Sequence, residues 1–139
     1  MRRVVPDVVS NQQLLELPPT ATVRGAALAM RERHVGAVLV TTDGHLNGIF
    51  TERDMVNRVV AESRDPDQAT LADVMTANPD TIAPTTTAID ALRLMNDGGY
   101  RHLPIVENGR VVGIVSRRDF HGDEKARLDD ESDLWKKIG

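Results

Sequence analysis

The stretch GIFTERD at residues 48–54 decides the fold, because almost the same residues recur as GIVSRRD at 113–119. The offset that relates Gly48 to Gly113 also relates further identical residues without a gap. A constant register over such a length predicts two copies of one supersecondary unit. The matched residues are Pro19, Thr20, Thr22, Ala26, Met30, Gly44, Gly48, Ile49, Arg53 and Asp54, which recur as Pro84, Thr85, Thr87, Ala91, Met95, Gly109, Gly113, Ile114, Arg118 and Asp119.

Each copy carries the same pattern of predicted secondary structure. Apolar residues at helical spacing predict a helix after Thr22 and another after Thr87, and both threonines are suitable N-caps. After each helix, two short apolar runs flank turn residues and predict a β-hairpin, which a second helix follows. A short extended segment before the first helix completes a β-α-β-β-α unit. The predicted strands are residues 14–17, 37–40 and 46–50 in the first copy, and 80–82, 103–106 and 111–115 in the second.

The repeats set the predicted domain boundaries at 8–62 for the first copy and 71–122 for the second. The connector between them is polar, and Thr70 is placed to cap a short helix over 71–75. The tail from His121 is highly charged, with a weak apolar stripe. We interpret residues 123–139 as a peripheral C-terminal helix or tail. Its stripe is Leu128, Leu134, Trp135 and Ile138.

Composition places the chain in the α/β class and argues against several classes of function. Only four of the 139 residues are Phe, Tyr or Trp, so an aliphatic core of sheet and helices is expected. The absence of cysteine excludes disulfides, a thiolate zinc site and a cysteine nucleophile. A net charge of −4 argues against nonspecific nucleic-acid or membrane binding. No run resembles a signal peptide or a membrane span, so we expect a cytoplasmic protein.

The repeated heptad has two compatible interpretations. Thr51 and Ser116 stand where a strand becomes a helix, three residues before Asp54 and Asp119. In the first interpretation each pair forms a capping box that only starts a helix. In the second, the free amides and dipole of the helix N-terminus attract a phosphate, and the ionised aspartate accepts both hydroxyls of a ribose.

Two units that each end in Gly-apolar-apolar-Ser/Thr-x-Arg-Asp resemble a tandem pair of CBS domains, often called a Bateman module. The stretch YRHLPIV at 100–106 adds to the resemblance, which covers about residues 8–120. The resemblance implies two β-α-β-β-α repeats packed about a pseudo-twofold axis. It also implies two clefts that commonly bind AMP, ADP, ATP, NAD or S-adenosylmethionine.

The resemblance assigns Asp54 and Asp119 to the ribose and places Thr51 and Ser116 near phosphate. It sets Asp54 against Arg101 and His102, and it sets Asp119 against the uncharged Gly36 and Ala37. A phosphorylated adenosine ligand is therefore expected to prefer the cleft of Asp54. The candidate ligand-binding residues are Gly36, Ala37, Thr51, Arg53, Asp54, Thr81, Ile82, Arg101, His102, Pro104, Ser116, Arg118 and Asp119.

We predict no catalytic and no metal-binding residues. The sequence has no Gly-rich phosphate loop and no recognisable triad, and its histidines lack metal-ligand spacing. The predicted function is a stand-alone regulatory, energy-sensing CBS pair that binds an adenosine nucleotide, with AMP or ATP favoured, and signals to an unidentified separate protein. The alternative is a ligand-free dimerisation or scaffold module in which Ser/Thr-x-x-Asp only caps helices. A homodimer is predicted because the helix after the first hairpin carries Met55, Val56, Val59 and Val60.

Overall fold

A computed structural model gives the fold of residues 1–120, and the helix predicted for 123–139 lies outside the described residues. The chain forms two compact units, which we describe separately. The first-repeat unit holds residues 13–80 and 108–111, and the described part of the second-repeat unit holds 1–12, 81–107 and 112–120. These units divide the chain differently from the boundaries 8–62 and 71–122, which stay a prediction about the repeats.

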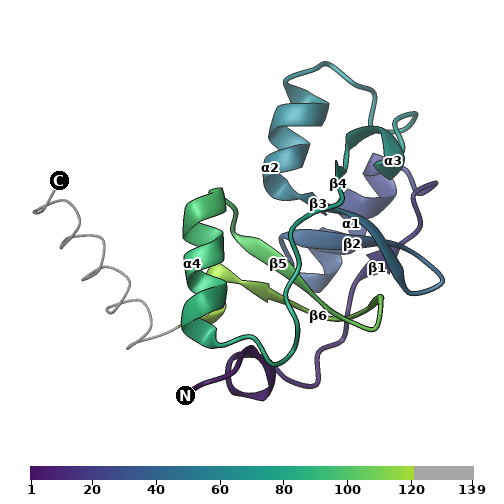
Figure 1. The fold of residues 1–139 in the computed structure, drawn as a ribbon. Helices are drawn as coiled ribbons and strands as arrows, with labels where there is room; N and C mark the ends of the chain where they lie inside the picture. The colour runs from purple at the N-terminus through teal and green to yellow at the C-terminus, as the bar shows by residue number, and fades with distance from the viewer. Residues whose placement is uncertain (121–139) are drawn as a thin grey trace, which may run out of the picture. The chain divides into compact units, whose positions relative to one another are not determined.

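The first-repeat unit is a small sheet with helices. The two-residue β1 (Glu16–Leu17) pairs in parallel with β2 (Ala37–Thr42), which pairs antiparallel with β3 (His45–Thr51). A further strand, β4 (Thr76–Ala77), pairs antiparallel with β3. The helices are α1 (Val23–Arg33), α2 (Glu52–Asp54), its continuation η2 (Met55–Val60), and α3 (Leu71–Val74) (Figure 1).

Helix α1 forms where the apolar spacing predicted it. The Thr22 hydroxyl accepts a hydrogen bond from the Gly25 amide at 3.1 Å, which caps the first turn. The helix ends at His34, whose φ of 55° is left-handed. Its inward face packs on the sheet and on the helices that follow the hairpin and the connector. The buried core of this unit is Val23, Ala26, Met30, Val38, Val40, Phe50, Val59, Ala69, Leu71 and Val74.

Both predicted hairpins are confirmed, and each turn uses two left-handed residues. Asp43 and Gly44 have φ values of 53° and 82°, and Asn108 and Gly109 have 52° and 79°. Two successive positive φ angles match the right-handed twist of the flanking strands. The tip of the second hairpin belongs to the first-repeat unit, because the Val111 amide donates to the Gly44 carbonyl at 3.1 Å.

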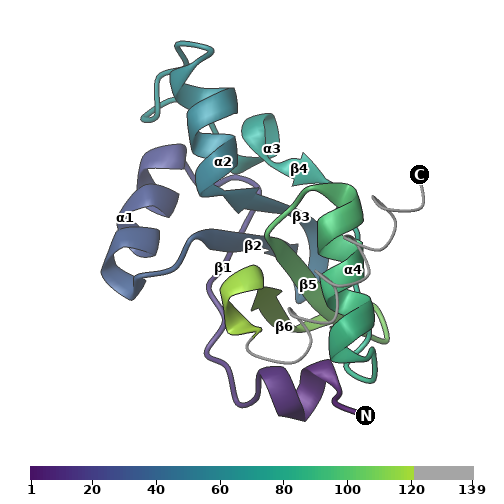
Figure 2. The ribbon, with the colours of Figure 1, turned by 90° about the vertical axis from the view of Figure 1, so that its left-hand side faces the viewer.

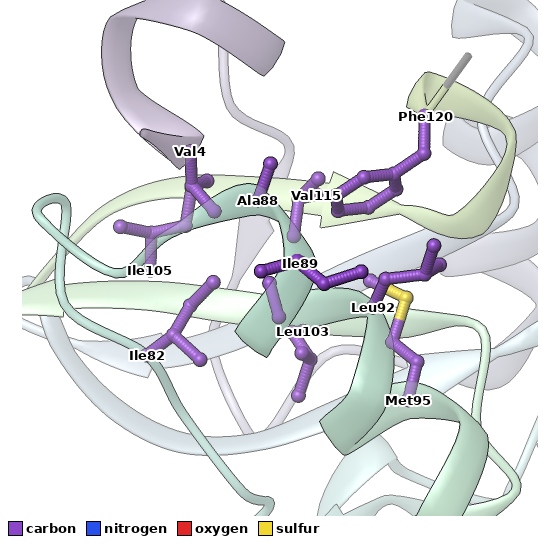
Figure 3. Close-up of a cluster of buried hydrophobic side chains, with 11 residues drawn as sticks. Val4, Ile82, Ala88, Ile89, Leu92, Met95, Leu103, Ile105, Val115 and Phe120 are labelled. Atoms are coloured by element: carbon purple, nitrogen blue, oxygen red, sulfur yellow. The ribbon is translucent and has the colours of Figure 1, made fainter. Parts of the chain in front are cut away.

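The second-repeat unit contains α4 (Ala88–Gly98), β5 (His102–Glu107), most of β6 (Arg110–Ser116) and the short η3 (Arg117–Asp119). The Thr87 hydroxyl caps α4 by accepting from the Asp90 amide at 3.3 Å. Figure 3 shows side chains from α4, from both strands and from the N-terminal turn meeting in one cluster. That core is Val4, Ile82, Ala88, Ile89, Ala91, Leu92, Met95, Leu103, Ile105, Val115 and Phe120.

The N-terminal residues complete the second-repeat unit, which the sequence did not reveal. The irregular turn η1 (Val4–Val8) lies beside the start of α4 (Figures 1 and 2). The Val4 amide donates to the Thr86 carbonyl at 2.8 Å, and Val4 itself is fully buried. The Gln12 side chain pairs with Ile114 as a strand residue would, donating to its carbonyl at 2.7 Å and accepting from its amide at 2.9 Å.

Three predicted elements differ in extent. The strand predicted over 14–17 is only two residues long, and the one over 80–82 is a single parallel bridge between Ile82 and Ile105. The helix predicted after the second hairpin is seen only as η3, since the rest lies beyond residue 120. Strand β4 was not predicted, because it depends on a close approach to Gly48 from a distant part of the chain.

Candidate ligand-binding site

The first Ser/Thr-x-x-Asp motif forms the capping box that its spacing predicted. The Thr51 amide donates to Asp54 Oδ2 at 3.0 Å, and the Asp54 amide donates to the Thr51 hydroxyl at 3.2 Å. The same hydroxyl lies 3.2 Å from Asp54 Oδ2, to which it donates. These bonds fix the start of α2 at the end of β3, so the predicted capping box is present at the first motif.

The Asp54 carboxylate has further partners that the sequence did not suggest. The Thr76 hydroxyl lies 3.2 Å from Oδ1 and 3.4 Å from Oδ2, and the Arg58 Nε lies 3.5 Å from Oδ1. Asp54 is only 7 % exposed. Arg58 could have been inferred from its i, i+4 spacing to Asp54, whereas nothing in the sequence pointed to Thr76. We call Thr51, Asp54, Arg58 and Thr76 the Asp54 cluster.

Gly36, Ala37 and Arg53 lie in the same unit as the Asp54 cluster. The Glu52 amide donates to the Gly36 carbonyl at 3.1 Å, and Ala37 is the cross-strand neighbour of Thr51. A Cβ on Gly36 would lie 3.3 Å from the Glu52 carboxylate, so that side chain covers the glycine. Arg53 is exposed on the first helical turn. The structure therefore gathers these candidate residues around one strand end.

The second motif is less completely bonded than the first. The Ser116 amide donates to Asp119 Oδ2 at 2.7 Å, but the buried Ser116 Oγ has no hydrogen-bond partner within residues 1–120. The Arg117 amide donates to the Arg101 carbonyl at 2.8 Å, which brings the exposed Arg101 next to this motif. Asp119 is half-buried, in contrast to Asp54.

The remaining candidates of the second repeat lie along β5 and its neighbours. The Ile82 amide donates to the Pro104 carbonyl at 3.0 Å, so Thr81 and Ile82 run beside β5. His102 is half-buried at the start of β5, and Arg118 is exposed on η3. The predicted pairing of Asp54 with Arg101 and His102, and of Asp119 with Gly36 and Ala37, joins the two units and stays a prediction.

A third Thr-x-x-Asp sequence, Thr70 to Asp73, forms a capping box outside the repeated heptad. The Thr70 amide and hydroxyl donate to Asp73 Oδ2 at 3.0 and 3.1 Å at the start of α3, as predicted from Thr70. The bond from the Thr70 amide, and to a smaller extent the bond from its hydroxyl, holds the pKa of the exposed Asp73 carboxyl below its ordinary value. This motif lies outside the repeated heptad and serves as an internal reference for the other two.

The described residues carry no sign of a metal centre or a membrane span. Within residues 1–120, no group of three or more His, Asp or Glu side chains is arranged to hold a metal ion. The helices of this part of the chain are too short or too polar to cross a bilayer.

Comparison with known proteins decides the family. A profile of the CBS domain matches residues 5–61 and 71–121, once for each repeat. The chain belongs to the CBS domain family. The CBS domain-containing protein YhcV of Bacillus subtilis is 36 % identical over 108 residues, which cover 78 % of this chain and 76 % of that protein.

Other CBS relatives are longer or have been solved with a ligand. The CBS domain-containing protein CBSCBSPB3 of Arabidopsis thaliana is 41 % identical over 102 residues, but the match spans 73 % of this chain and only 18 % of the relative. The CBS domain protein PAE2072 from Pyrobaculum aerophilum, solved in complex with AMP, superimposes with a TM-score of 0.79 at 26 % identity. That match covers 93 % of this chain and 97 % of the neighbour.

Proposed function

We propose that this CBS pair is a regulatory module that binds an adenosine nucleotide and acts on a separate protein without chemistry of its own. AMP or ATP is favoured, and NAD and S-adenosylmethionine are the other candidates. The observation that carries the proposal is the AMP complex of the Pyrobaculum protein, which matches nearly the whole of this chain. The sequence GIFTERD and its copy GIVSRRD supply the residues that the family resemblance assigns to such a ligand.

The proposed binding relies on the carboxylates of the two motifs and on Arg101. An ionised carboxylate such as Asp54 or Asp119 accepts hydrogen bonds from both ribose hydroxyls. Arg101 is exposed, and its planar guanidinium donors are suited to a phosphate. We propose that the phosphorylated ligand prefers the site that the family resemblance assigns to Asp54, Arg101 and His102, because Gly36 and Ala37 give the other assigned site no charge.

Titration calorimetry with AMP tests this ranking. Because alanine at Asp54 would also remove the helix cap, the better variants are Asp54→Asn, Arg101→Gln and Asp119→Asn. We expect Asp54→Asn and Arg101→Gln to weaken the tighter binding event about 10- to 100-fold, since each loses a charge-assisted hydrogen bond of roughly 1.5–3 kcal/mol. Asp119→Asn is expected to leave that event unchanged, and AMP is expected to be recovered intact.

The matched control is Asp73→Asn, which changes a Thr-x-x-Asp cap outside the repeated heptad. It is expected to bind AMP as the unchanged protein does, with circular dichroism confirming that every variant folds. The ranking is wrong if Asp119→Asn abolishes the tighter event while Asp54→Asn and Arg101→Gln retain it. The nucleotide proposal fails if a thermal-shift screen of AMP, ADP, ATP, NAD and S-adenosylmethionine gives no stabilisation, because a ligand at 100 times its Kd raises the free energy of unfolding by roughly 2.7 kcal/mol.

A dimerisation or scaffold role is the second candidate, and the surface of η2 favours it. Val56 and Val60 are 59 % and 69 % exposed and lie one turn apart, whereas Val59 is buried and Met55 packs against the core. The predicted apolar face is therefore divided, with two of its four residues left for a partner. Exposed apolar residues grouped on a helix are typical of an interface between copies.

Light scattering tests the homodimer. The protein is expected to have twice its chain mass of 15.3 kDa at micromolar concentration. Val56→Glu with Val60→Glu is expected to give the monomer mass, because buried charges oppose association. Val112→Glu, which changes another exposed valine, is the control and is expected to remain dimeric. A monomer mass for the unchanged protein would contradict the proposal.

A further inference from the structure

Residues 75–78, which follow α3, are held in place by the Asp54 cluster. Thr76 reaches both carboxylate oxygens of Asp54 through its hydroxyl. Arg58 contacts the same carboxylate, and its Nη1 donates to the Met75 carbonyl at 2.7 Å. The Asn78 amide donates to the Asn47 carbonyl at 3.3 Å, just beyond β4. Residues 75–78 are thus attached through a residue that also belongs to the candidate ligand site.

The Asp54 carboxylate has little capacity left for a ligand. A carboxylate offers about four acceptor positions. These positions already face four donors, which are the Thr51 amide, the Thr51 hydroxyl, the Thr76 hydroxyl and the Arg58 Nε. A ribose that uses two of these positions must therefore displace an existing donor.

Thr76 is the donor that is easiest to displace. The Thr51 amide is fixed by the capping box at 3.0 Å, so it leaves only if α2 unwinds. Arg58 forms an ion pair with Asp54 at 3.5 Å and is also held by the Met75 carbonyl at 2.7 Å. The Thr51 hydroxyl is neutral and also lies at 3.2 Å, but it is held in the capping box by the Asp54 amide. The Thr76 hydroxyl is neutral too, its bonds are long at 3.2 and 3.4 Å, and it has no place in that box.

The second repeat does not share this arrangement. In the constant register that relates Asp54 to Asp119, the position of Arg58 is taken by Asp123, an acidic residue that cannot donate to a carboxylate when ionised. Within residues 1–120 the donor to the Asp119 carboxylate is the Ser116 amide. Within residues 1–120, the attachment is seen at the first motif alone.

We propose that the Thr76 hydroxyl and the ribose of a bound nucleotide compete for Asp54, so that binding there releases the Thr76 side chain and loosens residues 75–78. The proposal rests on the nucleotide-binding function proposed above. It makes residues 75–78 the segment that reports ligand occupancy, and it makes Thr76 a positioning residue that acts through Asp54.

Hydrogen exchange of the ligand-free protein tests the attachment without any ligand. Thr76→Val removes the hydroxyl at nearly constant size, and it is expected to speed amide exchange at residues 75–78 about tenfold, the effect of one lost hydrogen bond. Thr76→Ser keeps the hydroxyl and is the matched control, expected to exchange as the unchanged protein does. Equal exchange in Thr76→Val and Thr76→Ser would overturn the proposal.

Titration with AMP tests the competition. AMP is expected to speed exchange at 75–78 in the unchanged protein, and Thr76→Val is expected to bind AMP about 2- to 10-fold more tightly, because no hydroxyl has to be displaced. Thr76→Ser is expected to bind as the unchanged protein does. Weaker or equal binding by Thr76→Val would overturn the proposal. If AMP bound no variant, both the proposed function and the ligand-driven step would fail. Hydrogen exchange of the ligand-free protein would still decide whether Thr76 holds residues 75–78.

Discussion

Leu92→Ala is expected to lower the free energy of unfolding by about 2–5 kcal/mol. Leu92 lies on α4 and is fully buried in the second-repeat core. Its neighbours in that core, Ile105 and Phe120 among them, come from a strand and from the end of the described chain, so they cannot all move inward to fill the space. Alanine leaves a cavity, and the lost contacts add to the lost hydrophobic burial. Urea denaturation followed by circular dichroism measures the effect.

Leu28→Ala is the matched control for this prediction. Leu28 lies on α1, the helix that corresponds to α4 in the first copy, but it is 47 % exposed. The same change there is expected to alter stability by no more than about 0.5 kcal/mol, as is usual for a surface position. Similar losses for Leu92→Ala and Leu28→Ala would show that the second-repeat core does not depend on close packing around α4.

Gly48→Ala is expected to lower the free energy of unfolding by about 1–3 kcal/mol and to displace residues 75–78. A Cβ at this position would lie 2.6 Å from the Thr76 carbonyl oxygen and 2.7 Å from the Met75 sulfur. Because the first of these atoms belongs to the backbone, β4 must move away from β3. Thermal or urea unfolding measures the cost, and hydrogen exchange at residues 75–78 shows whether β4 has moved.

The repeat supplies the control, Gly113→Ala, at the equivalent position of the second heptad. The nearest atoms to a Cβ there are Gln12 Oε1 at 2.8 Å and Ile105 Cδ1 at 3.0 Å, which are the ends of flexible side chains. Relieving these contacts moves side chains and strains the two hydrogen bonds of Gln12 to Ile114, but it requires no movement of a neighbouring strand. Alanine also reduces the conformational entropy of the unfolded chain, by about 0.4–1 kcal/mol. The cost of Gly113→Ala is therefore expected to be clearly smaller than that of Gly48→Ala. Equal costs would contradict the view that Gly48 is required by backbone contact with β4.

The sequence by itself determined the elements whose signals are local. The spacing of Val23, Ala26 and Met30 predicted α1, and Asp43 with Gly44 predicted the turn between β2 and β3. Thr51 and Asp54 are three positions apart, so their capping box could be inferred directly. These features depend on residues within one or two turns of each other, and the constant offset between the two heptads then showed that the pattern occurs twice.

Only the tertiary structure decided how the two copies of the heptad differ. Thr76 reaches Asp54 from 22 residues away, and Gln12 reaches Ile114 from 102 residues away. The two-residue β4 and the turn η1 carry no periodic pattern of their own, because each is fixed by contacts with distant backbone. Such contacts are set by packing in three dimensions, and spacing along the chain does not encode them. The same motif is therefore a crowded, buried carboxylate at Asp54 and a half-buried one at Asp119.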